Sequence, residues 1–210
     1  ANARGMLDVP RLRKALEELG SQNIISGLLS FDDGKENRAF TDRSVNEIVK
    51  ATFEMAKVKT GALMVIERST PLNEIERTGI EIDGLISSQL LINIFEHNTP
   101  LHDGAVVLSG NKVIAATCYL PLSDNMDISK DLGTRHRAAV GISEVSDSLT
   151  VVVSEETGRV SVAENGSLSH IKDSDELKKV LSRLTEQKET GGKRFKIWKG
   201  RIRNERKVAK

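Results

Sequence analysis

The chain has 210 residues, of which 38% are hydrophobic and 29% are charged, so it can form one substantial domain with extensions. The formal net charge of +1 conceals an asymmetry, because residues 193–210 carry nine Lys/Arg and one acid while the rest of the chain is acidic. A single cysteine, Cys118, excludes an intrachain disulfide, and no apolar stretch approaches the roughly 18 residues of a membrane span, so we expect a soluble chain from a reducing compartment.

The first 43 residues are expected to lie outside the main domain. Residues 7–20 predict a short amphipathic helix that ends at a glycine, and the polar, glycine-containing residues 21–43 predict a linker. The main domain is then expected at residues 44–187, followed by a basic C-terminal tail at residues 188–210.

Apolar residues at helical spacing predict helices in the main domain. Ser44 and Glu47 have the spacing of a capping box at the start of the first helix. The apolar positions of that helix are Val45, Ile48, Val49, Thr52, Met55 and Ala56. Those of the next helix are Ile86, Leu90, Leu91, Ile94 and Phe95. A helix from about Asp173 to Gln187 is expected to close the domain.

Five apolar stretches predict buried strands. They are 61–67 by itself, 104–109 paired with 112–120, and 149–154 paired with 159–164. Gly110-Asn111 and the sequence EETG provide the turns of the two hairpins. Together with the helices, these strands predict an α/β domain with a mixed central β-sheet covered by helices.

Residues 132–140, LGTRHRAAV, place two arginines and a histidine where an apolar helix is expected to begin. Gly133 supplies a turn, Thr134 is a good N-cap, and the small apolar residues that follow form a buried face. The free backbone N–H groups and the guanidinium groups of Arg135 and Arg137 would then point the same way, which suits an anion such as phosphate. A solvated helix start is the alternative.

The segment 98–105 places His102 and Asp103 in a turn between Pro100 and Gly104, just before an apolar strand. An Asp-Gly pair before a strand is most often only a turn. The functional alternative is a metal site or a general base, since an imidazole and a carboxylate can share one divalent ion.

The second hairpin turn and the only tyrosine offer further candidates. The turn at residues 154–158 carries two acids, which are usually solvated. Near a phosphate, one of these carboxylates could hold Mg²⁺ or Mn²⁺ while Ser154 binds a phosphate oxygen. Tyr119 either packs in the core or offers a stacking surface for a base. Cys118, beside it, is expected to be buried and unreactive.

These segments resemble, in their order, the diadenylate cyclase (DAC) domain. The matching segments are DGA, a strand pair ending in CYLPLS, LGTRHRAAVG and a strand ending in VVVSEETG, and the likeness spans about residues 44–165. The chain looks most like the membrane-anchored cyclase class of Gram-positive bacteria, in which a short transmembrane region precedes the catalytic domain. The resemblance implies the cytosolic part of a longer protein at the cytoplasmic face of the cell membrane.

The resemblance implies an enzyme that condenses two ATP molecules into cyclic di-AMP and releases two pyrophosphates. Asp103 would help to activate the attacking 3′-hydroxyl, and Gly104 would let the backbone approach the nucleotide. His102, Asp103 and Glu156 would bind a divalent metal, Mn²⁺ or Mg²⁺, with Co²⁺ as a further candidate. The residues assigned to catalysis are Asp103, Gly104, Arg135 and His136.

Nucleotide binding is assigned to the same segments by the resemblance. Tyr119 would stack on adenine, the Leu120 backbone would read the adenine edge, and Arg137 would order the phosphate loop. The expected substrate-binding residues are Ala105, Tyr119, Leu120, Gly133, Thr134, Arg135, His136, Arg137 and Ser154.

The symmetric product implies that two chains meet face to face, as a homodimer or a higher homo-oligomer. The family also implies a membrane regulator and a cell-wall precursor enzyme as partners, and no specific nucleic-acid binding is expected.

Two other functions are compatible with parts of the sequence. A sensor that binds cyclic di-AMP or ATP without turnover would need Arg135 and Tyr119 but not the metal ligands. A nucleic-acid-binding protein would use Phe195 and Trp198 among the cations of the tail. A solvated tail, or one that touches anionic lipid, is the simpler interpretation.

Overall fold

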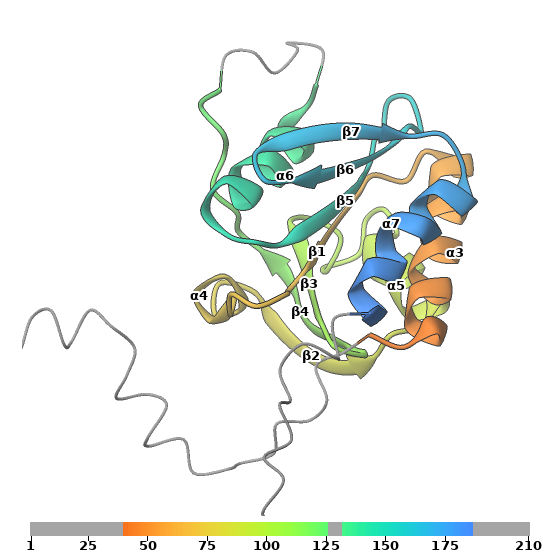
Figure 1. Ribbon diagram of the computed structural model, residues 1–210, viewed down its shortest axis with the longest axis horizontal. Coiled ribbons are helices and arrows are strands. Elements are labelled where there is room, and N and C mark those ends of the chain that lie inside the picture. The colour runs from red at the N-terminus through yellow and green to blue at the C-terminus, as the bar shows by residue number, and fades with distance from the viewer. Residues whose placement is uncertain (1–39, 126–131, 187–210) are drawn as a thin grey trace, which may run out of the picture. The chain divides into compact units, whose positions relative to one another are not determined.

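The computed structural model describes residues 40–125 and 132–186, in which a mixed β-sheet carries helices on both faces (Figure 1). In chain order the elements are α3 (Asp42–Val58), β1 (Ala62–Ile66), α4 (Asn73–Glu76), β2 (Ile80–Leu85), α5 (Ser88–Phe95), β3 (Ala105–Ser109), β4 (Lys112–Cys118), α6 (Thr134–Val145), β5 (Leu149–Val153), β6 (Val160–Glu164), β7 (Ser167–Ile171) and α7 (Ser174–Glu186). The seven strands lie in the order β2-β4-β3-β1-β5-β6-β7. The β1–β3 pair is parallel, and all other neighbouring pairs are antiparallel. The predicted α/β fold with a mixed central sheet is confirmed.

The hydrophobic core lies in two layers because successive side chains of a strand point to opposite faces of the sheet. On β1, Met64 and Ile66 pack into the layer formed with α3, α5 and α7, whereas Leu63 and Val65 pack into the layer formed with α6. Figure 1 shows α3, α5 and α7 together on one side of the sheet and α6 on the other. The layer on the α6 side contains fewer buried residues, and α6 carries the arginine-rich segment.

The start of α3 differs from its prediction. Thr41, not Ser44, is the N-cap, and its hydroxyl accepts a hydrogen bond from the Ser44 amide at 3.3 Å. Glu47 does not complete a capping box, because its carboxylate accepts the backbone amide of Ser88 at 2.7 Å. That hydrogen bond lowers the pKa of Glu47 and ties α3 to the start of α5.

The described part of the chain begins four residues before the predicted domain boundary at residue 44. Phe40 is buried in the core, with 5% of its surface exposed, so these residues also pack against the domain. The expected helix at 7–20, the linker up to residue 39 and the tail from residue 187 lie outside the described residues.

Three short elements were not predicted, namely β2, α4 and β7. The two strands form the edges of the sheet, where side chains are largely exposed and hydrophobic alternation is therefore weak. In addition, the pairing of β2 shifts register between Glu81 and Gly84, with Asp83 in a left-handed conformation (φ 43°) between them.

Both predicted hairpins are confirmed, and the turn of the second one packs against the end of α3. The β3–β4 and β5–β6 pairs are antiparallel, with their turns at Gly110 and at residues 154–159. Gly158 has φ +72°, and a Cβ on this residue would collide with the Ala56 carbonyl oxygen near the end of α3. The β5–β6 turn therefore has a fixed position relative to the sheet.

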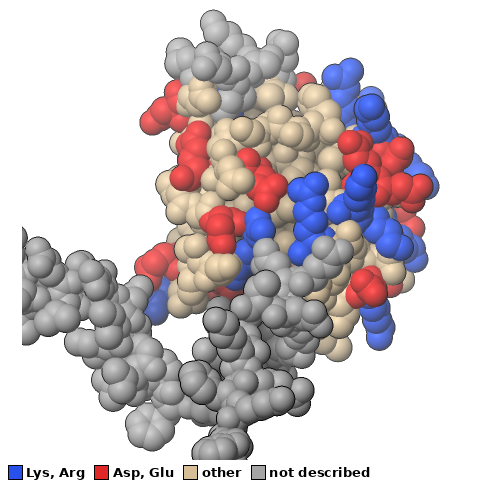
Figure 2. Space-filling view, viewed as in Figure 1, with Lys and Arg blue, Asp and Glu red and all other residues tan. Residues whose placement is uncertain are grey.

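The expectations for the cysteine and for membrane-spanning helices can be compared with the structure. Cys118 is buried, and burial with a smaller contribution from Glu76 raises the pKa of its thiol to about 11. No helix in residues 40–125 and 132–186 is both long and apolar enough to cross a bilayer. On the face shown in Figure 2, acidic and basic side chains of the described residues lie side by side over α3 and α7.

Candidate functional site

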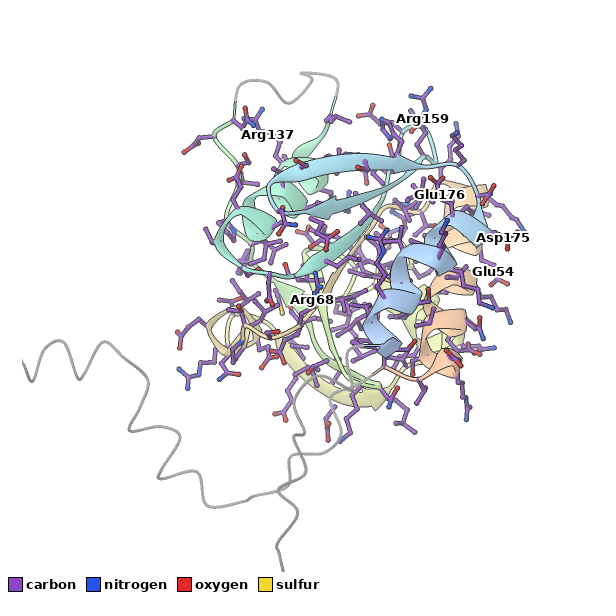
Figure 3. All side chains as sticks on the ribbon, in the orientation of Figure 1. Glu54, Arg68, Arg137, Arg159, Asp175 and Glu176 are labelled. Carbon is purple, nitrogen blue, oxygen red and sulfur yellow. The ribbon has the colours of Figure 1, made fainter. Side chains whose placement is uncertain are left out.

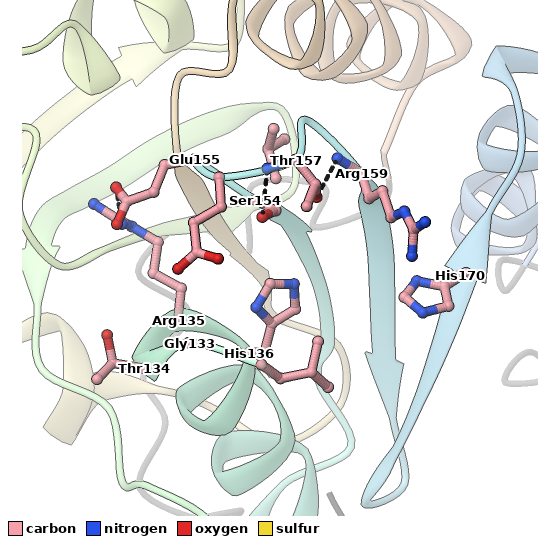
Figure 4. Close-up of a pocket in the computed structure, with 12 residues that line it drawn as sticks. Gly133, Thr134, Arg135, His136, Ser154, Glu155, Thr157, Arg159 and His170 are labelled. Carbon is pink, nitrogen blue, oxygen red and sulfur yellow. Dashed lines mark hydrogen bonds and ion pairs between the residues drawn. The ribbon is translucent and has the colours of Figure 1, made fainter. Parts of the chain in front are cut away.

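Two adjoining pockets lie at the start of α6. The large pocket, about 680 Å³, lies beside the start of β3 and the end of β4. The small pocket, about 250 Å³, lies between the start of α6 and the β5–β6 turn (Figure 4). Thr134, Arg135 and Glu155 line both pockets, so the two share a wall.

The structure brings most of the predicted site residues into these two pockets. Those in the large pocket are Asp103, Gly104, Tyr119, Leu120, Thr134 and Arg135. Those in the small pocket are Gly133, Thr134, Arg135, His136, Ser154 and Glu156. Three predicted residues, His102, Ala105 and Arg137, line neither pocket.

The start of α6 is an open helix N-terminus. Gly133 is the N-cap and provides no side-chain hydrogen bond, so the expectation that Thr134 caps the helix is wrong. The amides of His136 and Arg137 bond to the Gly133 carbonyl at 3.1 and 3.3 Å. The amides of Thr134 and Arg135 have no acceptor within the helix, which leaves two N–H donors and the positive end of the helix dipole at the wall of both pockets.

Arg135 forms an ion pair that the sequence did not reveal. Its Nη1 lies 2.6 Å from Oε2 of Glu155, which belongs to the β5–β6 turn (Figure 4). The pair lies over Gly61, since a Cβ on that glycine would be 3.0 Å from both atoms. A side chain predicted to meet phosphate is thus held in place by a carboxylate.

His136 is not the third cation that the sequence suggested. Its ring is buried, and its Nδ1 has no hydrogen-bond partner in the structure. Burial is the largest cause that lowers the pKa of His136, His170 and Arg135 act in the same direction, and Glu156 opposes them. The imidazole is therefore neutral at neutral pH, and it offers hydrogen bonds rather than charge to the small pocket.

The β5–β6 turn presents its polar groups in a fixed arrangement. The Ser154 hydroxyl accepts the Thr157 amide at 3.3 Å, and the Gly158 amide bonds to the Ser154 carbonyl at 2.8 Å. Because the hydroxyl oxygen already accepts, its own hydrogen can be donated to a ligand in the pocket. Glu155 and Glu156 lie within this turn, both exposed.

Gly104 is required by the packing of the backbone around it. It has φ +100°, and a Cβ would lie 2.8 Å from the carbonyl carbon of Thr117 on β4. Thr117 in turn has φ 57°, so the two strands approach closely where the large pocket begins. Gly104 also lines the large pocket, and the expectation that it lets the backbone approach the nucleotide stays a prediction. Asp103 precedes this contact and is exposed in the large pocket.

The three expected metal ligands do not come together within the described residues. No group of three or more His, Cys, Asp or Glu side chains suited to a metal ion is found there. Asp103 lines the large pocket and Glu156 the small one. The Nδ1 of His102 lies 2.6 Å from the Thr99 carbonyl, which can only accept, so Nδ1 carries a proton and Nε2 is left as the potential ligand.

That donor set still suits a divalent ion that is completed by a substrate. A ring nitrogen from His102 and a carboxylate from the adjacent Asp103 are acceptable ligands for Mn²⁺. Ions of this kind are commonly held by one or two protein carboxylates together with phosphate oxygens.

Tyr119 and Arg137 have different roles in the structure. Tyr119 is 76% exposed at the large pocket, so the alternative that it packs in the core is wrong and its ring is free to stack. Arg137 donates from Nη2 to the Ser123 carbonyl at 3.1 Å, while its own carbonyl accepts the Ser123 amide. Figure 3 shows Arg137 well apart from Arg159 of the β5–β6 hairpin. Arg137 orders a segment next to the site.

Three residues of the small pocket were missed by sequence reasoning, namely Glu155, Arg159 and His170. Glu155 was noticed as one of two acids, but nothing in the sequence distinguished it from Glu156. His170 lies on β7, which was not predicted, and its Nδ1 lies 2.9 Å from the Ser161 hydroxyl of the neighbouring strand.

The fold and the site define an α/β domain in which a helix start without a side-chain cap borders two pockets lined by polar residues. Residues 49–168 match the family described as DAC, "DisA bacterial checkpoint controller nucleotide-binding". The chain belongs to this family of diadenylate cyclases.

Relatives and solved structures agree with that assignment. The chain is 48% identical over 194 residues to the cyclic di-AMP synthase CdaA of Bacillus subtilis, covering 91% of this chain and 69% of the relative. It is 47% identical to a diadenylate cyclase of Listeria monocytogenes, covering 91% of this chain and 68% of the relative. A crystal structure of a double mutant of DacA from Staphylococcus aureus matches with a TM-score of 0.67 and 49% identity, over 69% of this chain and 97% of that chain.

Proposed function

We propose that this protein condenses two ATP molecules into cyclic di-AMP and releases two pyrophosphates. The relatives named as diadenylate cyclases support the reaction. The observation that carries the proposal is the shared wall between the pockets. Asp103, an exposed carboxylate, lines one pocket, and the helix start at Thr134 and Arg135, to which we assign phosphate binding, borders both.

In this proposal the nucleotide lies across both pockets. The adenine stacks on the exposed ring of Tyr119 and the ribose lies by Asp103, both in the large pocket. The phosphates meet the amides of Thr134 and Arg135 at the shared wall. They continue toward His136 and Ser154 in the small pocket, where a neutral imidazole and a free hydroxyl hydrogen can bind phosphate oxygens.

The reaction joins a 3′-oxygen to the α-phosphorus of a second ATP. The hydroxyl proton passes to Asp103, a new P–O bond forms, and the bond between the α-phosphorus and the bridging oxygen breaks. Pyrophosphate leaves with that electron pair, and charge develops on its oxygens. The helix start and Arg135 stabilise this charge because their donors are already oriented.

His102, Asp103 and Glu156 are proposed to hold a divalent metal, Mn²⁺ or Mg²⁺, with Co²⁺ as a further candidate. Such an ion supplies a positive charge that makes the hydroxyl more acidic and offsets charge on the phosphates. His102 would bind through Nε2, since Nδ1 is committed to Thr99. Because Glu156 lines the small pocket and Asp103 the large one, the bound phosphates would complete the ligand set.

The product requires two chains. One helix start, one Asp103 and one exposed tyrosine provide for one ATP per chain, whereas cyclic di-AMP contains two symmetric bonds. Two protomers related by a two-fold axis would let each 3′-hydroxyl attack the α-phosphorus of the nucleotide in the other. Asp103 of each protomer would activate the hydroxyl of its own nucleotide.

This arrangement predicts that activity depends on protein concentration. The cyclic di-AMP formed per milligram of protein should rise with concentration until dimers saturate, because isolated protomers cannot turn over. The measurement combines specific activity with analytical ultracentrifugation over the same dilution series. A constant specific activity down to concentrations at which only monomers sediment would disprove the two-chain mechanism.

The identity of the product tests the function itself. The protein is incubated with ATP and Mn²⁺, and with ATP and Mg²⁺, and the nucleotides are identified by mass. We expect cyclic di-AMP and pyrophosphate in a ratio of one to two, and no product after a chelator removes the metal. If ATP binds but stays intact with either metal, the protein is a nucleotide sensor.

The location and the partners of the protein stay predictions. They are attachment at the cytoplasmic face of a membrane, a membrane regulator and a cell-wall precursor enzyme.

A further inference from the structure

The ion pair between Arg135 and Glu155 is unlike an ordinary surface pair. Its atoms are 2.6 Å apart, and the Arg135 side chain is only 21% exposed. By contrast, Arg77 and Glu74 are 2.9 Å apart and lie almost fully in solvent, at 75% and 86% exposure. An exposed pair of that kind is weakly held because solvent screens it, whereas a short, half-buried pair holds its side chains in one geometry.

The surroundings of the pair also fix its place. Both side chains line both pockets, so the pair forms part of the shared wall. Gly61 leaves room beneath it, because a Cβ there would be 3.0 Å from Arg135 Nη1 and from Glu155 Oε2. Glu155 itself belongs to the β5–β6 turn, which Gly158 seats against the carbonyl of Ala56. The backbone from which Glu155 extends is therefore held in place, and its carboxylate is an acceptor for the long side chain of Arg135.

The pair uses only part of the guanidinium group. Glu155 engages Nη1, and no other hydrogen bond of the Arg135 side chain is found in the part of the chain that the structure describes. A guanidinium group has five N–H donors in a planar fork. Once Nη1 is anchored, the guanidinium group has fewer orientations open to it, and its remaining donors are available to a phosphate.

We propose that Glu155 is a positioning residue that holds the Arg135 guanidinium group in the orientation that receives the phosphates of ATP. This inference rests on the proposed function for its substrate, but it concerns binding and can be tested without turnover. Anchoring Arg135 beforehand means that binding ATP does not have to order that side chain. It also aligns the donors with the bond that breaks, where small displacements are costly.

The test is a double-mutant cycle on ATP binding, measured by calorimetry with the full chain. Glu155→Gln keeps the size of the side chain and removes its charge, and it is a mild change because Glu155 is half exposed. We expect this change to weaken the binding of ATP about 10-fold and the binding of adenosine less than 2-fold, since adenosine has no phosphate. In an Arg135→Ala background, the same change should alter ATP affinity less than 2-fold, because Glu155 acts through Arg135.

Two further variants separate positioning from general stability. Glu164→Gln breaks a pair of similar length and burial, Arg68–Glu164 at 2.7 Å, that lines neither pocket, and it should leave ATP affinity unchanged. Gly61→Ala leaves both charges in place but crowds the Arg135–Glu155 pair. It should therefore weaken the binding of ATP more than the binding of adenosine. Far-UV circular dichroism and thermal melting check that each variant is folded.

The outcomes divide clearly. Tighter ATP binding by Glu155→Gln would mean that Glu155 competes with phosphate for Arg135, and it would overturn the proposal. An equal loss in the wild-type and Arg135→Ala backgrounds would also overturn it, because Glu155 would then act independently. If the cycle behaves as expected and yet no cyclic di-AMP forms from ATP, the positioning role stands and the proposed function fails.

Discussion

Replacing Asp103 by Asn should lower the rate of cyclic di-AMP formation roughly 10²–10⁴-fold, the range expected for the loss of a general base. The change keeps the size of the side chain but removes its ability to take the hydroxyl proton. Asp103 is exposed in the large pocket, and its side chain forms no hydrogen bond or ion pair with another described residue, so its replacement should not unfold the domain. The measurement is the initial rate of product formation at saturating ATP and metal.

A matched control and a binding measurement accompany this prediction. Asp175→Asn removes a carboxylate from the first turn of α7, which lines neither pocket, and should leave the rate unchanged (Figure 3). ATP affinity should change little in Asp103→Asn if its main role is to accept the proton. Near-normal production of cyclic di-AMP by a folded Asp103→Asn protein would remove Asp103 from the chemistry.

Replacing Arg135 by Ala should weaken ATP binding by ~1.5–3 kcal/mol, roughly 10- to 150-fold, and should hardly affect adenosine. The reason is that the guanidinium group lines the wall shared by both pockets, beside the free amides of the helix start. In the proposed arrangement, truncation removes charge-assisted hydrogen bonds to phosphate and leaves the stacking of adenine on Tyr119 in place. Calorimetric titrations with ATP, AMP and adenosine measure the difference directly.

Arg68→Ala provides the control for Arg135→Ala. Arg68 has nearly the same side-chain exposure as Arg135, 20% against 21%, and it also pairs with a glutamate, but it lines neither pocket. Removing the Arg68 side chain should change neither the affinity for ATP nor the affinity for adenosine. Equal losses for ATP and adenosine in Arg135→Ala would place this arginine away from the phosphates.

Local patterns in the sequence determined the central strands and both hairpins. The apolar run at 61–67 predicts a strand buried on both faces, and β1 is buried along its length. Gly110-Asn111 allows only a tight turn between two apolar strands, and the structure has that turn. These features are local, because they depend on residues within a few positions of one another.

Signals of the same kind misplaced the helix caps. Ser44 and Thr134 both have suitable side chains, yet Thr41 caps α3 and Gly133 begins α6. Several neighbouring residues can cap a helix, and the packing of the chain before the helix decides among them. In α3 that packing includes Phe40, which lies in the core.

The sequence alone singled out Asp103, Arg135 and Ser154 as candidate site residues, and the structure brings all three to adjoining pockets. Only the tertiary structure decided how these groups are tuned. Arg135 meets Glu155 from a different element, 20 positions along the chain. His136 is neutral because it is buried, and burial is a property of the packed domain. Pairing and desolvation depend on neighbours that are distant in sequence, so no local pattern could have shown either.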